Sequence, residues 1–241
     1  MIPFLVVLFA WFFQSITGFG AGLFIIGILS LLYDPKMVVV SSALFNLLGT
    51  LGLLYQNRKG KVEPYLLFSL VLGSLPGVFL GAYLLDRFDQ KTLRLLIGVF
   101  IVLIGFYDLL VNRGWLRVRL DRRMGFPVGF LGGLFAGLVG MGGPPPLVFL
   151  SQQLKDPRSI KLMLNLYFTS NILFRLTFYQ QMEVVNLDWN FVKAGLLGIF
   201  LGLFLGGIIS AKLPSDLYRT GVSYGVIILG FLLIILTEAG L

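Results

Sequence analysis

The stretch "GLVGMGGPPPLVFL", residues 137–150, lies inside an apolar segment that is long enough to cross a lipid bilayer. Three consecutive prolines, 144–146, stand near the middle of that segment. A proline inside a continuous helix removes a backbone donor and clashes with the carbonyl four residues earlier. The stretch therefore predicts a broken helix, with glycines at the break and prolines in the first turn of a second helix.

The whole chain is far more apolar than a soluble protein. Of its 241 residues, 57% are hydrophobic and 12% are charged, whereas soluble domains carry about 25% charged residues. The apolar runs are long and continuous, unlike the alternating pattern of a transmembrane barrel. We therefore predict an all-α integral membrane protein. Because the chain has no cysteine and no histidine, thiol chemistry, histidine-based zinc sites and histidine proton relays are excluded, and no cofactor is expected.

Apolar segments and short charged connections alternate along the chain. The eight segments are residues 2–31, 37–55, 64–85, 92–112, 125–152, 160–180, 190–211 and 217–237. The connection at 113–124 is basic and central, and we predict that it links a first half, 1–112, to a second half, 125–241. Asp34–Pro35 and Asp156–Pro157 are typical helix starts, with aspartate as the cap and proline in the first turn.

The two halves resemble each other. "GFGAG" at 18–22 matches "GMGGP" at 140–144 with an offset of 122 residues, and "YDP" at 33–35 matches "KDP" at 155–157 with the same offset. Beyond these motifs the offset is 125 residues, as in Asn46 and Asn171, so a single three-residue insertion reconciles the two halves. Glycines spaced four apart also match, and they predict close helix packing: Gly73, Gly77 and Gly81, and Gly198, Gly202 and Gly206. Internal duplication of this kind is typical of secondary transporters.

The distribution of lysine and arginine favours one membrane topology. If all eight segments span the bilayer, the two faces carry nine basic residues each, with Arg175 set aside. If the first and fifth segments instead enter and leave on one face, the faces carry thirteen and five. The positive-inside rule prefers the second arrangement, which predicts inverted repeats, re-entrant first and fifth segments, a cytoplasmic linker and both termini outside. The rival interpretation is a long, tilted and kinked helix.

The breaks and the segments that follow them supply the candidate binding residues. A half-helix that begins inside the membrane presents free backbone donors and partial positive charge, which together favour a small anion. Arg175 lies near mid-membrane without an acidic partner at that depth, and such a charge is functional by default. The predicted substrate-binding residues are Gly18, Gly20, Gly22, Asn46, Thr50, Gly140, Gly142, Gly143, Pro144, Asn171, Arg175 and Tyr179. The alternatives are a structural kink at the breaks, an arginine that bonds free carbonyls, and asparagines that join helices.

The duplicated glycine break followed by "DP" resembles the TauE/SafE family of sulfite and organosulfonate exporters. The resemblance covers nearly the full chain and is most specific in "GLVGMGGPPPLVFL" with "KDP". It implies transport of sulfur oxyanions or organosulfonates, such as sulfite, sulfoacetate or thiosulfate, across the inner membrane.

The residues and the resemblance together predict a secondary transporter of a small anion that works by alternating access between inverted repeats. A passive anion channel with the same lining is the alternative, because no buried carboxylate or histidine is available for proton coupling. An intramembrane enzyme is not expected, since paired acids and cysteines are missing. The expected partners are the lipid bilayer and the anion. We attribute the net charge of +8 to the excess of basic residues on the cytoplasmic face, and not to a surface that binds nucleic acid.

Overall fold

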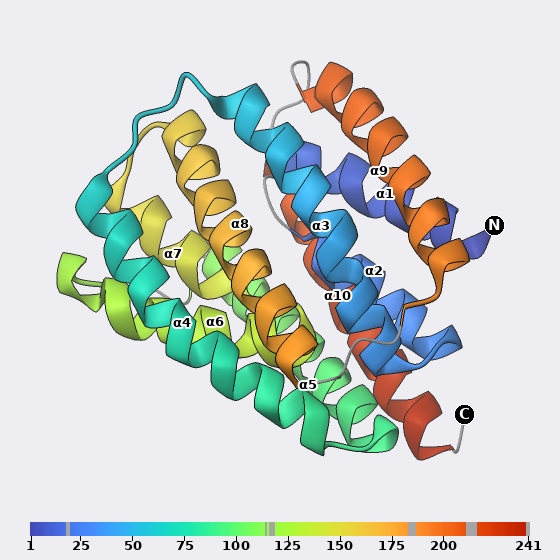
Figure 1. Ribbon diagram of the computed structural model, residues 1–241. Helices are drawn as coiled ribbons and strands as arrows, with labels where there is room; N and C mark the ends of the chain where they lie inside the picture. Colours follow the sequence, from blue (N-terminus) through green and yellow to red (C-terminus); the bar gives the residue numbers. More distant parts are fainter. Residues whose placement is uncertain (18–19, 114, 116–118, 183–186, 211–215, 240–241) are drawn as a thin grey trace. The chain divides into compact units, whose positions relative to one another are not determined.

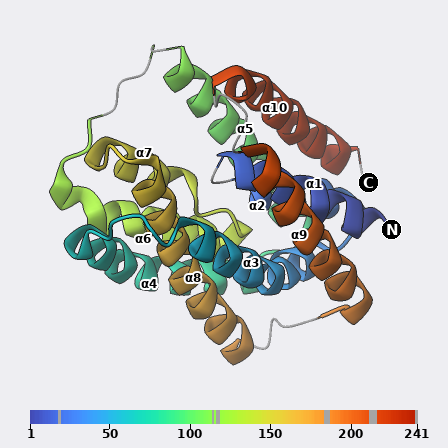
Figure 2. The same cartoon turned by 90° about the horizontal axis from the view of Figure 1, so that it is seen from above.

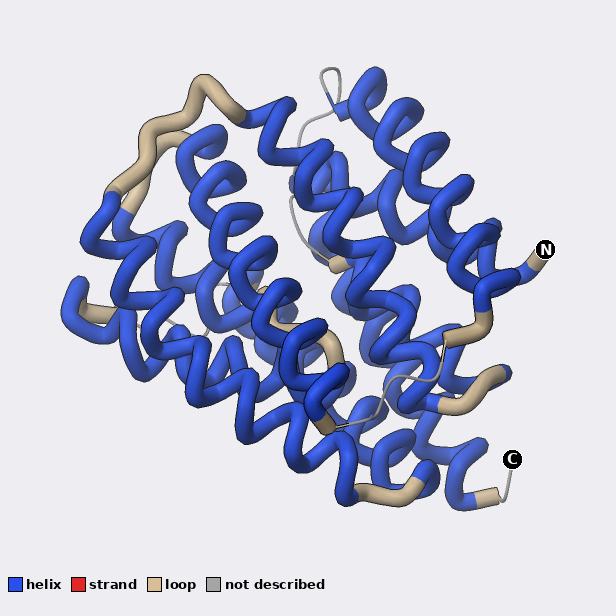
Figure 3. Tube along the Cα trace, in the orientation of Figure 1, coloured by secondary structure: helices blue, strands red, loops and turns tan. Residues whose placement is uncertain are grey.

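The computed structural model describes the chain except for residues 18–19, 114, 116–118, 183–186, 211–215 and 240–241. The described residues form helices joined by short connections and contain no strand (Figure 3). The elements are α1 (Ile2–Thr17), α2 (Ala21–Leu32), α3 (Pro35–Asn57), α4 (Pro64–Arg87), α5 (Gln90–Asn112), η1 (Arg122–Met124), α6 (Gly125–Val139), α7 (Pro144–Gln153), α8 (Pro157–Gln181), α9 (Trp189–Ser210) and α10 (Asp216–Glu238). The predicted all-α fold is confirmed.

Several helices have the length and composition to cross a membrane. Within the described part of the chain these are four: α3, α4, residues Gln90–Val111 of α5 and residues Trp189–Ile208 of α9. Helix α8 is longer than α9, with 25 residues against 22, but its sequence is less hydrophobic and it is not among these four helices. Its interior positions carry asparagine, threonine, serine and arginine side chains. Polar groups inside a membrane protein need partners, so α8 is a candidate to contribute to a binding site.

The helices form two compact units, and each unit takes residues from both sides of the central linker. The first unit comprises Met1–Val38, Phe88–Val118 and Lys193–Leu241, and the second comprises Val39–Arg87 and Arg119–Val192. Thus α1, α2, α5 and α10 belong to the first unit, and α4, α6, α7 and α8 to the second.

In the second unit, α4 and α6 lie side by side (Figure 1). A Cβ atom added to Gly73, Gly77 or Gly81 of α4 would lie 2.0, 2.2 or 2.3 Å from a backbone carbonyl oxygen of α6. Those distances are too short for any side chain, so only glycine allows the two backbones to approach so closely. The carbonyls belong to Phe126, Phe130 and Leu134.

In the first unit, α9 meets α1 in the same register. A Cβ atom at Gly198, Gly202 or Gly206 would lie 2.7, 2.6 or 2.6 Å from a backbone carbonyl oxygen of α1. These carbonyls belong to Phe4, Leu8 and Phe12, which precede the three partners on α6 by 122 residues. Both predicted glycine stripes therefore serve helix packing, and in each unit the stripe of one half of the chain contacts the equivalent turns of the other half.

The rest of the first unit is built around α5 and α10, which pack along each other (Figure 2). They approach closely where Gly98 meets Gly230: a Cβ atom on either glycine would lie about 3 Å from the carbonyl oxygen of the other, at 3.1 and 2.9 Å. Helix α2 packs against this pair through Gly27, whose added Cβ would contact Ile101 and Leu229 at 2.8 Å. The Trp11 side chain of α1 is fully buried in this unit.

Both predicted aspartate caps are present. The Asp34 carboxylate accepts a hydrogen bond from the Met37 amide at 2.9 Å, near the start of α3. Asp156 caps α8 by accepting from the amides of Arg158 and Ser159, and the Ser159 hydroxyl also donates to it at 2.6 Å. The hydrogen bond from the Ser159 side chain is the main reason that the pKa of Asp156 is lowered. The cap is therefore a carboxylate at neutral pH, complementary to the positive end of the helix.

The first and fifth apolar segments are both broken, as predicted, and each folds back on itself. Helix α1 ends at Thr17 and α2 begins at Ala21. The Phe9 and Phe24 rings lie 5.4 Å apart, although they are 15 positions apart in the chain. A straight helix would separate them by about 22 Å. A continuous tilted helix is thereby excluded for this segment.

Candidate anion-binding site

The break between α6 and α7 begins with a glycine in the left-handed region. Gly140 has φ 75° and its amide donates to the Ala136 carbonyl at 3.0 Å. The next amide, of Met141, donates to the Phe135 carbonyl at 3.2 Å. The Gly140 bond is that of the αL motif, which ends helices at glycine because a Cβ atom is strained at positive φ. The Gly140 amide is consequently occupied by the helix end.

The chain then passes so close to α6 that a second glycine is required. A Cβ atom at Gly142 would lie 2.3 Å from the Gly132 carbonyl oxygen and 2.7 Å from the Ala136 Cβ. The break is therefore packed onto the helix that precedes it, and this segment also turns back on itself. Gly143 has more room, since the nearest atom to its Cβ position is in the Phe168 ring at 3.3 Å.

The three prolines form the first turn of α7. The first hydrogen bond inside α7 runs from the Leu147 amide to the Gly143 carbonyl at 3.1 Å. The positions that the prolines occupy have no intrahelical partner in any α-helix, so the helix loses no bond to them. They also remove donors that the sequence analysis expected at this helix start, and Pro144 can offer a ligand only its ring and carbonyl. The donors that remain are the amides of Gly142 and Gly143, which make no hydrogen bond to a described residue.

Helix α8 presents a polar face to α6. The Tyr167 hydroxyl donates to the Gly129 carbonyl at 3.2 Å, and the Tyr179 hydroxyl donates to the Gly137 carbonyl at 2.5 Å. Gly137 lies in the last turn of α6, where carbonyls lack intrahelical partners. Asn171 and Arg175 lie between the two tyrosines at four-residue spacing, which places them along one side of the helix.

Arg175 is buried inside this face, with a relative exposure of 2%. Its Nε donates to the Tyr179 hydroxyl at 3.3 Å and its Nη2 donates to the Val39 carbonyl of α3 at 3.1 Å. A guanidinium has five N–H donors, so these bonds leave the larger part of the group without a hydrogen bond to a described residue. In the described part of the chain no carboxylate forms an ion pair with it. The charge is thus held by the Val39 carbonyl and the Tyr179 hydroxyl, and no carboxylate of the described residues neutralises it.

Asn171 adds a buried acceptor beside this charge. Its Nδ2 donates to the Tyr167 carbonyl at 3.0 Å, and its Oδ1 is buried without a partner in the described structure. The Oδ1 of Asn46 in α3 is likewise buried without a partner in the described structure. An unpartnered buried carbonyl costs about 1–3 kcal/mol. Two such groups lie at positions that the duplication relates, and each could accept a hydrogen bond from a ligand or a water molecule.

Thr50, another predicted binding residue, directs its hydroxyl to its own helix in the described structure. Its hydroxyl lies 2.8 Å from the Asn46 carbonyl and 2.9 Å from the Leu47 carbonyl of its own helix. The Thr169 hydroxyl of α8 lies 3.4 Å from it and donates to the Asn165 carbonyl of its own helix at 2.8 Å. Each hydroxyl proton is therefore directed to its own helix, and the two side chains meet where α3 lies beside α8.

The corresponding break in the first unit uses a side chain that the sequence analysis did not single out. Gly20 has φ 110°, and the following amide, of Ala21, donates to Gln14 Oε1 at 2.8 Å. Gln14 is almost fully buried in α1, so it caps the start of α2 from within the protein. The visible signal was an amide side chain inside an otherwise apolar run. Gly22 has no hydrogen bond from its amide to a described residue, and Gly18 lies outside the described residues.

Comparison with known families decides what kind of protein carries this arrangement. The family model "Sulfite exporter TauE/SafE" matches residues 3–233. The chain belongs to the TauE/SafE family. A protein of Cupriavidus necator named "Probable sulfite/organosulfonate exporter TauE" is 27% identical over 162 residues, which cover 66% of this chain and 63% of that protein. The chain thus aligns with less than two thirds of that relative's length, and no solved structure matches it significantly.

This TauE/SafE chain is a multi-pass membrane protein of a transporter family, not of an enzyme family. Among the described residues of its second unit, the Gly142 and Gly143 amides make no hydrogen bond, the Arg175 guanidinium has no carboxylate partner, and the Asn171 Oδ1 is buried without a donor.

Proposed function

We propose that this protein is a secondary transporter of a small anion of the sulfur-oxyanion or organosulfonate class for which its family is named. The observation that carries the proposal is the buried guanidinium of Arg175, which keeps free donors and has no carboxylate partner among the described residues. A bare charge in a membrane protein is costly. An anionic substrate offsets that cost when it binds.

The break at Gly140–Gly143 supports the same proposal. A Cβ atom at Gly143 would lie 3.3 Å from the ring of Phe168, which precedes Asn171 by three positions on α8, and the amides of Gly142 and Gly143 make no hydrogen bond to a described residue. Amides at the start of a helix attract anions even without a basic side chain. We propose that these amides, Asn171 and Arg175 contact the anion, while Tyr179 positions the guanidinium.

The test is binding followed by flux with the purified full chain. Sulfite, sulfoacetate and thiosulfate are added separately, and we expect at least one of them to raise the thermal midpoint of the protein at millimolar concentration. In liposomes the flux of that anion should saturate as its concentration rises, as expected of a carrier. Flux that rises linearly would instead support a passive channel. If none of the anions shifts the midpoint, the proposed substrate class is wrong.

We further propose that the two halves, 1–112 and 125–241, are inverted repeats and that the α1–α2 and α6–α7 hairpins enter and leave the membrane on one face each. The support is the thirteen-to-five distribution of basic residues, the glycine contacts in equal register and the fold-back of both hairpins. Alternating access would then come from the movement of one repeat against the other. Both chain termini would lie outside and the linker inside the cell.

This topology can be tested by cysteine labelling, because the native chain has no cysteine. Lys36→Cys and Lys155→Cys place one thiol after each hairpin. With a membrane-impermeant maleimide on intact cells, we expect Lys36→Cys to react and Lys155→Cys to react only after the cells are permeabilised. Labelling of both positions from the same face would contradict the inverted arrangement and would favour parallel repeats of four crossings each.

A further inference from the structure

An apolar groove opens at the amino end of α4, away from the site described above. Its volume is about 620 Å³. The α3–α4 connection, the first turns of α4 and one residue of α8 line it. The lining residues are Val62, Pro64, Tyr65, Leu67, Phe68, Val71 and Ser170. Tyr65 and Phe68 are more than half exposed. All these residues belong to the second unit.

The rim of the groove is basic. The Arg122 guanidinium lies 5.8 Å from the centre of the Tyr65 ring, and its Nη2 bonds Glu63 Oε2 at 2.7 Å. Lys61 directly precedes the lining residue Val62. Nearby, the Arg58 guanidinium lies 4.3 Å from the Tyr55 ring centre. Exposed aromatic rings next to basic side chains are typical of the boundary between lipid tails and head groups.

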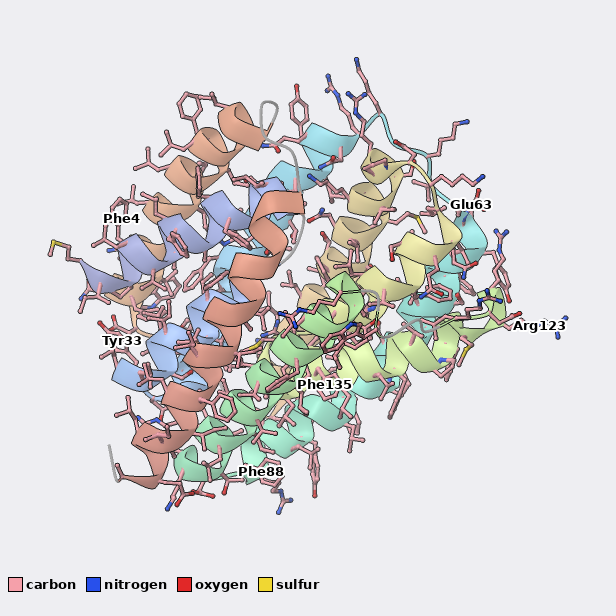
Figure 4. All side chains as sticks on the ribbon, turned by 180° about the vertical axis from the view of Figure 1, so that it is seen from behind. Phe4, Tyr33, Glu63, Phe88, Arg123 and Phe135 are labelled. Atoms are coloured by element: carbon pink, nitrogen blue, oxygen red, sulfur yellow. The ribbon has the colours of Figure 1, made fainter. Side chains whose placement is uncertain are left out.

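Three connections are tied together at this rim. The Lys61 amide donates to the Ser159 hydroxyl at 2.8 Å, and the Leu120 amide donates to Gln152 Oε1 at 2.8 Å. The Gln153 side chain in turn donates to the Leu120 carbonyl at 2.8 Å. Figure 4 shows nitrogen- and oxygen-tipped side chains around Glu63 and Arg123, in contrast to the carbon side chains along the helices. The basic residues of the three connections therefore belong to one surface.

The charge of this surface is strongly one-sided. Residues 57–64, 119–124 and 153–159 contain eight basic side chains and three acidic ones. The acids are already engaged, since Glu63 bonds Arg122, Asp121 caps η1 and Asp156 caps α8. The basic set is Arg58, Lys59, Lys61, Arg119, Arg122, Arg123, Lys155 and Arg158. The surplus positive charge calls for an anionic partner.

We infer that this groove is a binding site for an anionic phospholipid. An acyl chain would lie along Leu67, Phe68 and Val71, and the phosphate would meet the basic rim at Lys61 and Arg122. A groove that is apolar inside and cationic at its mouth is complementary to such a lipid, and basic pockets between membrane helices recognise anionic head groups. A zwitterionic lipid is a poorer partner, because its own amine meets the surplus positive charge.

The test compares lipids on the purified full chain in a neutral detergent. After removal of native lipid, dioleoyl phosphatidylglycerol or dioleoyl phosphatidylcholine is added, and bound lipid is measured by native mass spectrometry. We expect phosphatidylglycerol to be retained preferentially and to raise the thermal midpoint. Equal retention of both lipids would overturn the inference. Glycerol 3-phosphate supplies the head-group charge without the chain, and a full effect from it alone would show an anion site rather than a lipid site.

Two arginines of matched environment locate the site. Arg122 lies over Tyr65 at one end of α4, and Arg87 lies over Tyr83 at the other end, with 5.1 Å from the guanidinium to the ring centre. Arg122→Gln should weaken phosphatidylglycerol binding about fivefold, whereas Arg87→Gln should leave it unchanged. Equal effects of the two variants would contradict the location. If Arg122→Gln does not fold, Lys61→Gln replaces it, and Val71→Phe should fill the groove and reduce lipid retention without changing the charge.

Discussion

Replacing Arg175 by alanine is expected to abolish measurable anion binding while the protein still folds. Truncation of one partner of a buried, hydrogen-bonded charge pair costs about 2–5 kcal/mol, which corresponds to roughly 30-fold to 4,000-fold weaker binding. The loss follows because the guanidinium has free donors and no carboxylate partner in the described structure. The measurement is the shift in thermal midpoint caused by the anion that stabilises the wild type, together with its flux into liposomes.

Two further variants separate charge from geometry. Arg175→Lys keeps the charge but loses the planar fork, so we expect an intermediate loss. Tyr179→Phe keeps Arg175 but removes the hydroxyl that accepts from its Nε and donates to the Gly137 carbonyl, and a loss of about tenfold is expected. If Arg175→Ala lowers the midpoint of the free protein but leaves the anion-induced shift intact, Arg175 only joins α8 to α3 and α6.

Gly77→Ala is expected to lower the stability of the protein strongly. The added Cβ would lie 2.2 Å from the Phe130 carbonyl oxygen and 2.8 Å from the Leu134 amide nitrogen, and backbone atoms cannot move aside as a side chain can. Overpacking of this kind costs about 3 kcal/mol. For a chain of this size that corresponds to a fall in thermal midpoint of about 6–12 °C. Thermal unfolding of the purified protein in detergent measures it.

Gly202, the duplicate of Gly77, provides a matched variant, and Leu75 on the same helix as Gly77 provides a control. Gly202→Ala places a Cβ 2.6 Å from the Leu8 carbonyl oxygen and should also destabilise, though less, because that contact is longer. Leu75→Ala alters an α4 side chain that is 42% exposed, and its effect should stay within about 0.5 kcal/mol. A midpoint for Gly77→Ala close to that of Leu75→Ala would mean that α4 and α6 do not pack through these glycines.

The sequence predicts the helices of this protein well because each helix boundary has a local cause. The eight apolar segments agree with the observed helices to within a few residues, and the break in the fifth falls at the predicted glycines. Apolar runs of sufficient length form helices in a membrane, since backbone groups there must be bonded within the segment. Aspartate caps, prolines in first turns and glycines at positive φ act over a few residues, so they can be recognised without the fold.

The candidate site could be predicted only in part. Arg175 stood out from the sequence because a charge at that depth is rare, and the glycine break stood out because its helix could not continue. Gln14 did not stand out, since a single amide side chain in a mostly apolar segment does not indicate which backbone group it will bond. Thr50 is also a predicted binding residue, and the bond of its hydroxyl to its own helix could not be read from its spacing to Asn46.

The order of the helices, their broken first and fifth segments and the family of the protein follow from the sequence by itself, because they depend on composition, local chemistry and recurring motifs. Only the tertiary structure shows which polar groups near the break between α6 and α7 are left to bind a ligand. The three prolines turned out to cost α7 no hydrogen bond but to remove its donors, which leaves two amides at the break. The free part of Arg175 and the unpartnered oxygen of Asn171 are likewise set by contacts with α3 and α6, which come from distant parts of the chain.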